Sequence, residues 1–235
     1  MYNQKKLVII TIFILILIPS LVFGYHVLNI QNGFASYAFR TWSSVPQDFR
    51  VDSGTLGGDD GLPIVNNACQ TWNNVEGAKN LCGNLTRSSS DITSANFASI
   101  ADDDINDVVF DDDGMIFETF FGAGAGSGIL GIGCTTALIS TGEILEATLI
   151  INGTIPSTTS ADQLATTVHE FGHIWGLAHT PIGGINTDSS FPVGLDPIDP
   201  SDIPTMFPFA IPVTDVFGRT LEIDDEAIIK LQYPE

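Results

Sequence analysis

The chain has 235 residues, which is enough for one domain with a substantial hydrophobic core. Hydrophobic residues make up 44% of it and charged residues 15%, a balance that is typical of globular proteins and excludes an intrinsically disordered chain. The formal net charge is -20, from 8 basic and 28 acidic side chains. Because such a surface repels phosphate backbones, the composition argues against binding to nucleic acid.

The N-terminal residues have the pattern of a secretory signal. Lys5 and Lys6 form a short basic start, and residues 7–18 are apolar apart from one threonine. A Pro-Ser pair interrupts this run, and residues 22–24 offer small side chains at the two positions that a signal peptidase reads. We therefore expect cleavage before Tyr25.

This signal sets the expected domain organisation. Residues 1–24 form a signal peptide that is removed, and residues 25–235 form a single domain that is secreted, either outside the cell or into a periplasm. The apolar run through Val27 is also nearly long enough to span a bilayer, so an uncleaved N-terminal membrane anchor is the alternative. After cleavage, no membrane attachment is expected.

Three cysteines fit an oxidising compartment. Cys69 and Cys82 are close enough in sequence to close a small loop, and such a bridge would stabilise the fold by about 3 kcal/mol. Cys134 follows an apolar, glycine-rich stretch, where a buried and inert thiol is expected. The sequence alone leaves the pairing open.

In chain order, the apolar pattern first predicts a mixture of strands and helices. Extended structure is expected over residues 37–51, and an amphipathic helix over residues 61–77. Two short strands are expected over residues 108–110 and 117–121, with a turn between them. The glycine-rich residues 122–128 lack the Gly-Lys-Ser/Thr ending of a phosphate-binding loop, so we expect a flexible loop there.

The second half of the chain carries the strongest signals. Residues 129–139 predict an edge strand whose glycines let another backbone come close, and residues 144–151 predict a central strand. A capping-box pattern at Ser160 predicts the start of a helix that stops at Gly176. We expect a long surface loop over 181–204, and then a short C-terminal helix over 224–231 that buries Ala227, Ile228 and Leu231.

The residues that carry chemistry lie in one stretch of eleven, His-Glu-Phe-Gly-His-Ile-Trp-Gly-Leu-Ala-His, from position 169. On a helix, His169 and His173 lie on the same face, one turn apart. Glu170 lies roughly 100° round the helix, so it can reach a metal-activated water without being a ligand. Gly176 can adopt a left-handed conformation that ends the helix and returns His179 as a third ligand.

A set of three imidazoles is typical of a catalytic zinc site, which keeps a fourth position open, rather than of a closed structural site. Three of the four histidines fall in this stretch, so an ordinary buried role explains them poorly. The fourth, His26, lies beside the predicted cleavage point, and we therefore expect one zinc ion. The alternative is a zinc-stabilised binding or adhesion module without turnover. Glu170 argues against it, because a structural zinc needs no general base.

These residues resemble the metzincin metalloproteases, whose eleven-residue motif they match at every defined position. Residues 205–208, Thr-Met-Phe-Pro, are similar to the methionine-containing turn of that group. Within the group, the matrixin family, including small bacterial members, is the most similar. His179-Thr180, Met206-Phe207-Pro208 and a C-terminal helix that opens with Asp224-Asp225 all resemble matrixin features. The resemblance covers the chain from about residue 38, and its motifs are specific from about residue 160.

The resemblance implies a fold and an activity. The fold would be of the α+β class, with a twisted, mostly parallel sheet, an antiparallel edge strand, an active-site helix, a Met-turn and a C-terminal helix. The activity would be hydrolysis of peptide bonds in proteins or peptides by a zinc-activated water, with Glu170 as general base and then acid. An extended substrate would pair with the edge strand near residues 129–133, and residues 207–213 would line its pocket.

Other features depart from the family or stay open. No Cys-switch propeptide is expected, since few residues separate the signal from the domain, and the loop between His179 and Met206 is longer than in vertebrate matrixins. Matrixins commonly carry calcium, and seven aspartates between residues 102 and 113 suit Ca²⁺. An acidic, solvated turn explains them equally well.

Overall fold

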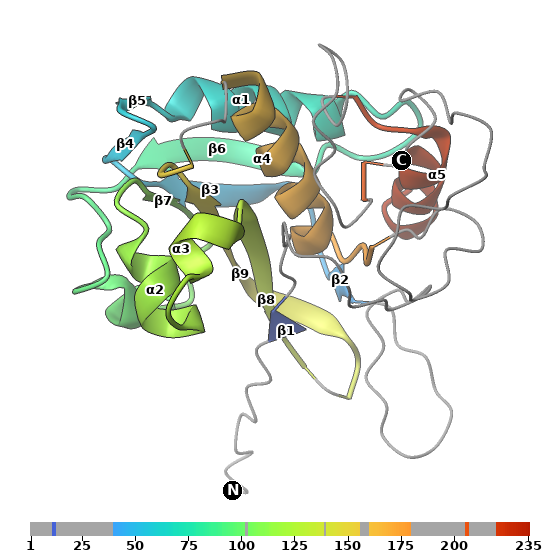
Figure 1. The fold of residues 1–235 in the computed structure, drawn as a ribbon. Coiled ribbons are helices and arrows are strands. Elements are labelled where there is room, and N and C mark those ends of the chain that lie inside the picture. The colour runs from blue at the N-terminus through green and yellow to red at the C-terminus, as the bar shows by residue number, and fades with distance from the viewer. Residues whose placement is uncertain are drawn as a thin grey trace, which may run out of the picture.

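The protein is built on one mostly parallel β-sheet with helices on both faces (Figure 1). The computed structural model describes residues 40–101, 103–138, 140–155, 160–179, 205–206 and 220–235, together with the backbone of residues 11–12. The strands of the sheet are β1 (Thr11–Ile12), β2 (Thr41–Trp42), β3 (Gln47–Val51), β6 (Cys82–Arg87), β7 (Asp107–Asp111), β8 (Gly131–Ala137) and β9 (Glu143–Asn152). The helices are α1 (Leu62–Asn73), the short 3₁₀ helix η1 (Phe97–Ser99), α2 (Met115–Phe121), α3 (Ala125–Gly128), α4 (Ser160–Ile174) and α5 (Ile223–Gln232).

The sheet has the strand order β1-β8-β9-β7-β3-β6, and β2 also pairs with β9. All pairs among β2, β3, β6, β7 and β9 are parallel, whereas β8 runs antiparallel to β9 and to the two-residue strand β1. A separate hairpin joins β4 (Thr55–Leu56) to β5 (Asp59–Asp60). The expected central strand and antiparallel edge region are therefore confirmed.

Two hydrophobic cores lie on the two faces of the sheet, because alternate residues of a strand point to opposite faces. On β9, Leu149 and Ile151 belong to the larger core, with α1 and α4, whereas Ile150 belongs to the smaller core, with α2. On β7, Val109 likewise points away from its neighbours Val108 and Phe110. The helices α1 and α4 thus cover one face, and α2 and α3 cover the other (Figure 1).

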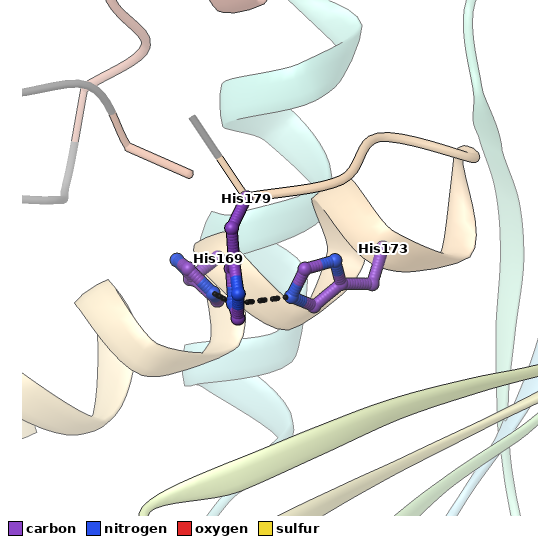
Figure 2. Close-up of side chains that lie close together, drawn as sticks. All are labelled: His169, His173 and His179. Atoms are coloured by element: carbon purple, nitrogen blue, oxygen red, sulfur yellow. Dashed lines mark hydrogen bonds between the residues drawn. The ribbon is translucent and has the colours of Figure 1, made fainter. Parts of the chain in front are cut away.

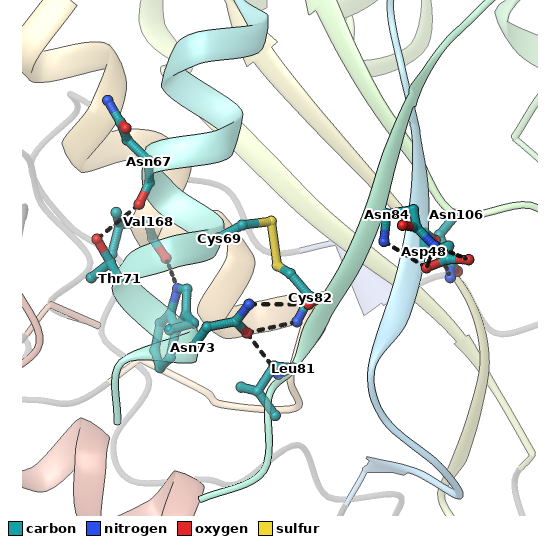
Figure 3. The surroundings of a disulfide bond; sticks show 11 residues. Asp48, Asn67, Cys69, Thr71, Asn73, Leu81, Cys82, Asn84, Asn106 and Val168 are labelled. Atoms are coloured by element: carbon teal, nitrogen blue, oxygen red, sulfur yellow. Dashed lines mark hydrogen bonds between the residues drawn. A yellow bond between two sulfur atoms is a disulfide. The ribbon is translucent and has the colours of Figure 1, made fainter. Parts of the chain in front are cut away.

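A disulfide between Cys69 and Cys82 ties α1 to the start of β6, with the two Cα atoms 5.6 Å apart (Figure 3). Beside it, the Asn73 side chain accepts the backbone N–H groups of Leu81 and Cys82 and donates to the Cys82 carbonyl. Cys134 is free and half-buried, and burial raises the pKa of its thiol to about 12, so it stays protonated. These observations resolve the pairing that the sequence left open.

The expected strand over residues 117–121 is wrong, because this segment belongs to helix α2. The Asp111 carboxylate accepts the backbone N–H groups of Ile116 and Phe117, at 3.1 and 2.9 Å. It supplies the acceptors that the first turn of a helix lacks. A short apolar run fits either a strand or a buried helix, and here the preceding aspartate favours the helix.

The expected flexible loop over residues 122–128 is also corrected in part, because Ala125–Gly128 forms the short helix α3. The Glu118 carboxylate accepts the backbone N–H groups of Gly124 and Gly126, at 2.8 and 3.0 Å. A side chain on α2 therefore fixes the conformation of a segment that its glycine content predicted to be flexible.

The C-terminal helix is present, but its buried face differs from the expected one. Ile228 is partly buried against the larger core, as expected, but Ala227 is exposed and Leu231 is 74% exposed, whereas Asp225 and Ile229 are the fully buried residues of α5. The helix is turned so that a carboxyl group faces the protein interior, and an apolar pattern alone cannot predict this.

Several expectations concern residues outside the described part of the chain. They include the signal peptide and anchor apart from Thr11–Ile12, the loop over 181–204, the pocket residues 207–213 and His26. Among the described residues, no helix combines the length and the apolarity needed to cross a membrane.

We predict that the disulfide contributes about 3 kcal/mol to the free energy of unfolding, because it closes a loop between residues 13 apart in the unfolded chain. The double variant Cys69→Ala/Cys82→Ala should lose roughly this amount in equilibrium urea unfolding. Cys134→Ala, which removes the free thiol and keeps the bridge, is the control. Equal midpoints for the double variant and wild type would contradict the prediction.

Candidate metal centre

Helix α4 carries the candidate site and is buried over most of its length. Residues 166–174 are all buried, between the sheet on one side and α1 on the other. The Trp72 indole of α1 donates to the Val168 carbonyl at 2.9 Å, which fixes the two helices against each other (Figure 3). The polar side chains of this helix therefore lie in a dry environment, where each needs a partner.

Two glycines of β8 allow α4 to lie against the sheet. A Cβ atom at Gly133 would stand 2.6 Å from the Glu170 carbonyl oxygen and 2.9 Å from His173 Cβ. A Cβ atom at Gly131 would stand 2.8 Å from Glu170 Cγ. Only residues without a side chain permit this approach, so the sequence-based expectation for these glycines is confirmed.

The three predicted ligands converge on one point (Figure 2). His169 Nε2 and His173 Nε2 lie 3.2 and 3.1 Å from His179 Nε2. Ligands of a tetrahedral zinc, each about 2.0–2.1 Å from the metal, are about 3.3 Å apart. The three histidines therefore lie close enough to bind one metal ion.

Backbone carbonyls orient two of the imidazoles. His169 Nδ1 lies 2.6 Å from the Thr205 carbonyl oxygen, and His173 Nδ1 lies 2.9 Å from that of Leu177. A carbonyl can only accept, so Nδ1 carries the proton in both rings and Nε2 presents its lone pair. This is the tautomer that a metal ligand needs.

The imidazoles are neutral at pH 7. Burial lowers the pKa of His169 to about 4 and that of His179 to about 3, and it lowers the pKa of His173 well below its ordinary value. The proximity of the other imidazole rings lowers the pKa of His173 and His179 further. Since metals bind neutral imidazole, the metal-free site is already in its binding form.

The turn after α4 brings His179 back to the helix. Gly176 has a φ of 92°, and the N–H groups of Gly176 and Leu177 donate to the carbonyls of His173 and Gly172. This pair of bonds is a Schellman motif, with glycine in the left-handed position. A side chain at Gly176 would collide with the Arg40 carbonyl. The turn expected from the sequence is therefore confirmed.

Side chains from distant segments hold the end of α4. The Trp42 indole donates to the Ile174 carbonyl at 3.0 Å, and the Tyr233 hydroxyl donates to the Trp175 carbonyl at 2.9 Å. These bonds satisfy carbonyls that have no partner within the helix. Sequence reasoning missed both residues.

Glu170 is fully buried, and neither carboxylate oxygen has a hydrogen-bond partner of ordinary geometry among the described residues. Burial raises the pKa of Glu170 well above its usual value, and the nearby Gly133 N–H opposes this only in part. Its side chain lies against Gly131 of β8. A buried acid without a protein partner is costly, and positive charge at the adjacent imidazole cluster would offset that cost.

Met206 and Thr205 lie beneath the site. Met206 is fully buried, and its thioether packs against α4 at Gly172. Thr205 supplies the carbonyl that orients His169, and its own N–H donates to the buried Asp225 carboxyl at 3.0 Å. Burial raises the pKa of Asp225 to about 7. The sequence offers no signal for backbone carbonyl partners, so it could not identify Thr205 or Leu177 in this role.

The aspartates suggested for calcium do not gather into a second site in the described part of the chain, where the three histidines are the one such cluster. Asp107 pairs with Arg50 through two bonds of 2.6 and 2.7 Å, and Asp111 caps α2 from the opposite end of β7. Asp112 accepts from Thr55 and from the Gly58 N–H. The described acids therefore serve structural hydrogen bonds.

The chain matches no protein-family model and no curated protein.

We predict that the site binds one divalent metal ion per chain. Titration of metal-free protein with Zn²⁺ should saturate at about one equivalent, and His179→Ala should weaken binding severely while leaving α4 folded, since His179 lies outside the helix. His26→Ala, which changes the fourth histidine, is the control. Two tightly bound ions in the wild type, or tight binding by His179→Ala, would contradict the prediction.

The glycines of β8 give a second prediction. Gly133→Ala should destabilise the fold by about 1–3 kcal/mol, because its new methyl group meets the backbone of α4. It should also weaken metal binding by displacing His173. Gly128→Ala, where a Cβ atom meets nothing within 4 Å, is the matched control. Thermal unfolding and metal titration measure both effects, and a Gly133→Ala protein as stable as wild type would refute the close approach.

Proposed function

We propose that this protein is a secreted zinc-dependent endopeptidase of the metzincin type, closest to the matrixin family. The eleven-residue motif supports this proposal, and so does the convergence of its three imidazoles on one point. The antiparallel strand β8, the buried Met206 and the helix α5 correspond to the edge strand, the Met-turn and the C-terminal helix that the resemblance implies. The Cys69–Cys82 disulfide is consistent with an oxidising compartment outside the cytosol.

The burial of the Glu170 carboxyl group beside the metal ligands is the observation that carries the proposal. A site that only binds metal needs ligands, whereas this one also buries a carboxyl group next to them that has no hydrogen-bond partner of ordinary geometry among the described residues. The same side chain lies against Gly131 of the edge strand. A general base for hydrolysis has to reach both the metal ligands and the bound substrate, and the position of Glu170, next to His169 in the sequence and against Gly131 of β8, supports that role.

The donor set favours zinc. Three neutral imidazoles with an open fourth position are typical of catalytic zinc sites, although nitrogen ligands alone also suit other first-row metals. When bound, zinc lowers the pKa of a water molecule and polarises a carbonyl group.

The chain's own residues would do the rest. The Glu170 carboxylate accepts a proton from the attacking water and later donates it to the leaving amine. The Thr205 and Leu177 carbonyls keep two imidazoles in the tautomer that binds metal. No strand among the described residues pairs with the outer edge of β8 at residues 131–133, so an extended peptide or protein substrate can add there by main-chain hydrogen bonds.

The second candidate is a zinc-stabilised binding or adhesion module without turnover. The same three imidazoles would bind the zinc of such a module, but the module has no role for Glu170. Burying an unpaired carboxyl group costs stability, and a module without catalysis gains nothing in return.

We expect Glu170→Gln to separate the two candidates. Glutamine keeps the shape of the side chain but cannot exchange protons at neutral pH, so zinc should still bind while turnover falls by about two to four orders of magnitude. Because the loss occurs in the transition state, kcat should fall and KM should change little. Glu76→Gln, an exposed position, is the control.

The measurement is cleavage of a broad peptide library by the purified mature protein, followed by kinetics on the best substrate. If the zinc-loaded wild type cleaves no peptide or protein, and Glu170→Gln binds the same partners equally well, the endopeptidase proposal fails. The zinc would then be structural, and the binding module would replace it.

A further inference from the structure

The two oriented imidazoles depend on different parts of the fold. His173 is held by the Leu177 carbonyl, four residues away, which the turn after α4 places automatically. His169 is held by the Thr205 carbonyl, 36 residues away in the sequence. Local structure cannot place that carbonyl, so another part of the protein has to.

Thr205 is anchored by the C-terminal segment. Its N–H donates to Asp225 Oδ2 at 3.0 Å, and its hydroxyl donates to the Thr220 carbonyl at 2.7 Å. The third polar group, its carbonyl, faces His169 Nδ1 at 2.6 Å. All the hydrogen-bonding groups of this residue are thereby engaged, and two of its three bonds lead to α5 or to the residues just before it.

Capping of α5 alone does not explain Asp225. The carboxyl group also accepts the Glu222 N–H, as the third residue of a capping box does, but this bond is longer, at 3.3 Å. Capping can be done by an exposed side chain, whereas Asp225 is 0% exposed and its other oxygen has no partner among the described residues. In its buried position, the Asp225 carboxyl group also contacts Thr205, which capping of α5 does not require.

We propose that Asp225 is a positioning residue for the metal centre, which acts on His169 by fixing the backbone of Thr205. The proposal rests on the metal-binding role proposed above for the three histidines. The Thr205 N–H and the Thr205 carbonyl belong to successive peptide groups on the two sides of its Cα, so Asp225 acts by position: holding the N–H fixes the direction in which the carbonyl points. The carbonyl then holds His169 with the proton on Nδ1 and the lone pair of Nε2 toward the other two imidazoles. The C-terminal helix thus sets the geometry of a ligand on a different helix.

The test compares zinc affinity with the state of the His169 ring. Loss of a partner that orients a metal ligand typically weakens binding about 10- to 100-fold, and we expect a loss of about tenfold for Asp225→Ala in a competition titration with a chelator. In metal-free protein labelled with ¹⁵N-histidine, NMR should find His169 as the Nδ1–H tautomer in the wild type and as a tautomer mixture in Asp225→Ala. Asp224→Asn removes one charge from the neighbouring residue and should match the wild type in both measurements.

The NMR readout separates positioning from a loss of stability. Unchanged zinc affinity in Asp225→Ala, or weaker affinity with an unchanged His169 tautomer, overturns the proposal. If the alanine variant does not fold, Asp225→Asn decides, because an amide oxygen is a weaker acceptor than a carboxylate and therefore holds the Thr205 backbone less firmly. The His169 Nδ1 proton should then move upfield, and an unmoved resonance overturns the proposal. Neither readout requires turnover, so the result stands apart from the fate of the endopeptidase proposal.

Discussion

The burial of α4 is the constraint on which the rest of the site depends. Over residues 166–174, α4 is buried between the sheet and a second helix, so most polar groups there need partners within the protein. The buried histidines and Glu170 differ in the partners that they find. Backbone carbonyls accept hydrogen bonds from the Nδ1 atoms of His169 and His173, and the Nε2 atoms of both rings lie 3.2 and 3.1 Å from His179 Nε2. The Glu170 carboxyl group has no hydrogen-bond partner of ordinary geometry among the described residues. Burial therefore creates a neutral ligand set beside a buried acid, which is the chemistry that the proposed function uses.

This burial requires a strand without side chains on one face. Gly131 and Gly133 of β8 leave room for α4, whereas Ile132 between them packs into the core on the opposite face. The same spacing brings the sheet edge next to Glu170. A substrate strand added to this edge would lie beside the proposed general base, so the condition for packing α4 would also bring the proposed substrate and base together.

Most buried acids in this very acidic protein accept backbone N–H groups. Asp52 accepts from Gly54, Ile92 and Phe110, and Asp111 accepts from the first turn of α2. Asp225 follows the same pattern, with one partner at its own helix start and the other at Thr205. This use accounts for the buried carboxyl group of α5, which its apolar pattern does not predict.

The sequence by itself determined the features that depend on local spacing. These are the placement of His169 and His173 one turn apart, the left-handed turn at Gly176, the return of His179, the central strand β9 and the glycine-bearing strand β8. All follow from the periodicities of helix and strand and from the conformational freedom of glycine, which residues a few positions apart decide.

The tertiary structure decided what depends on partners distant in the chain. The Thr205 carbonyl on His169, the Asp225 carboxyl group on Thr205, and the Tyr233 hydroxyl at the end of α4 have no signature in composition or period. The aspartate that makes residues 115–121 a helix acts through hydrogen bonds that an apolar pattern does not record. Hydrogen bonds between segments need a specific distance and direction, and only the packed chain provides these.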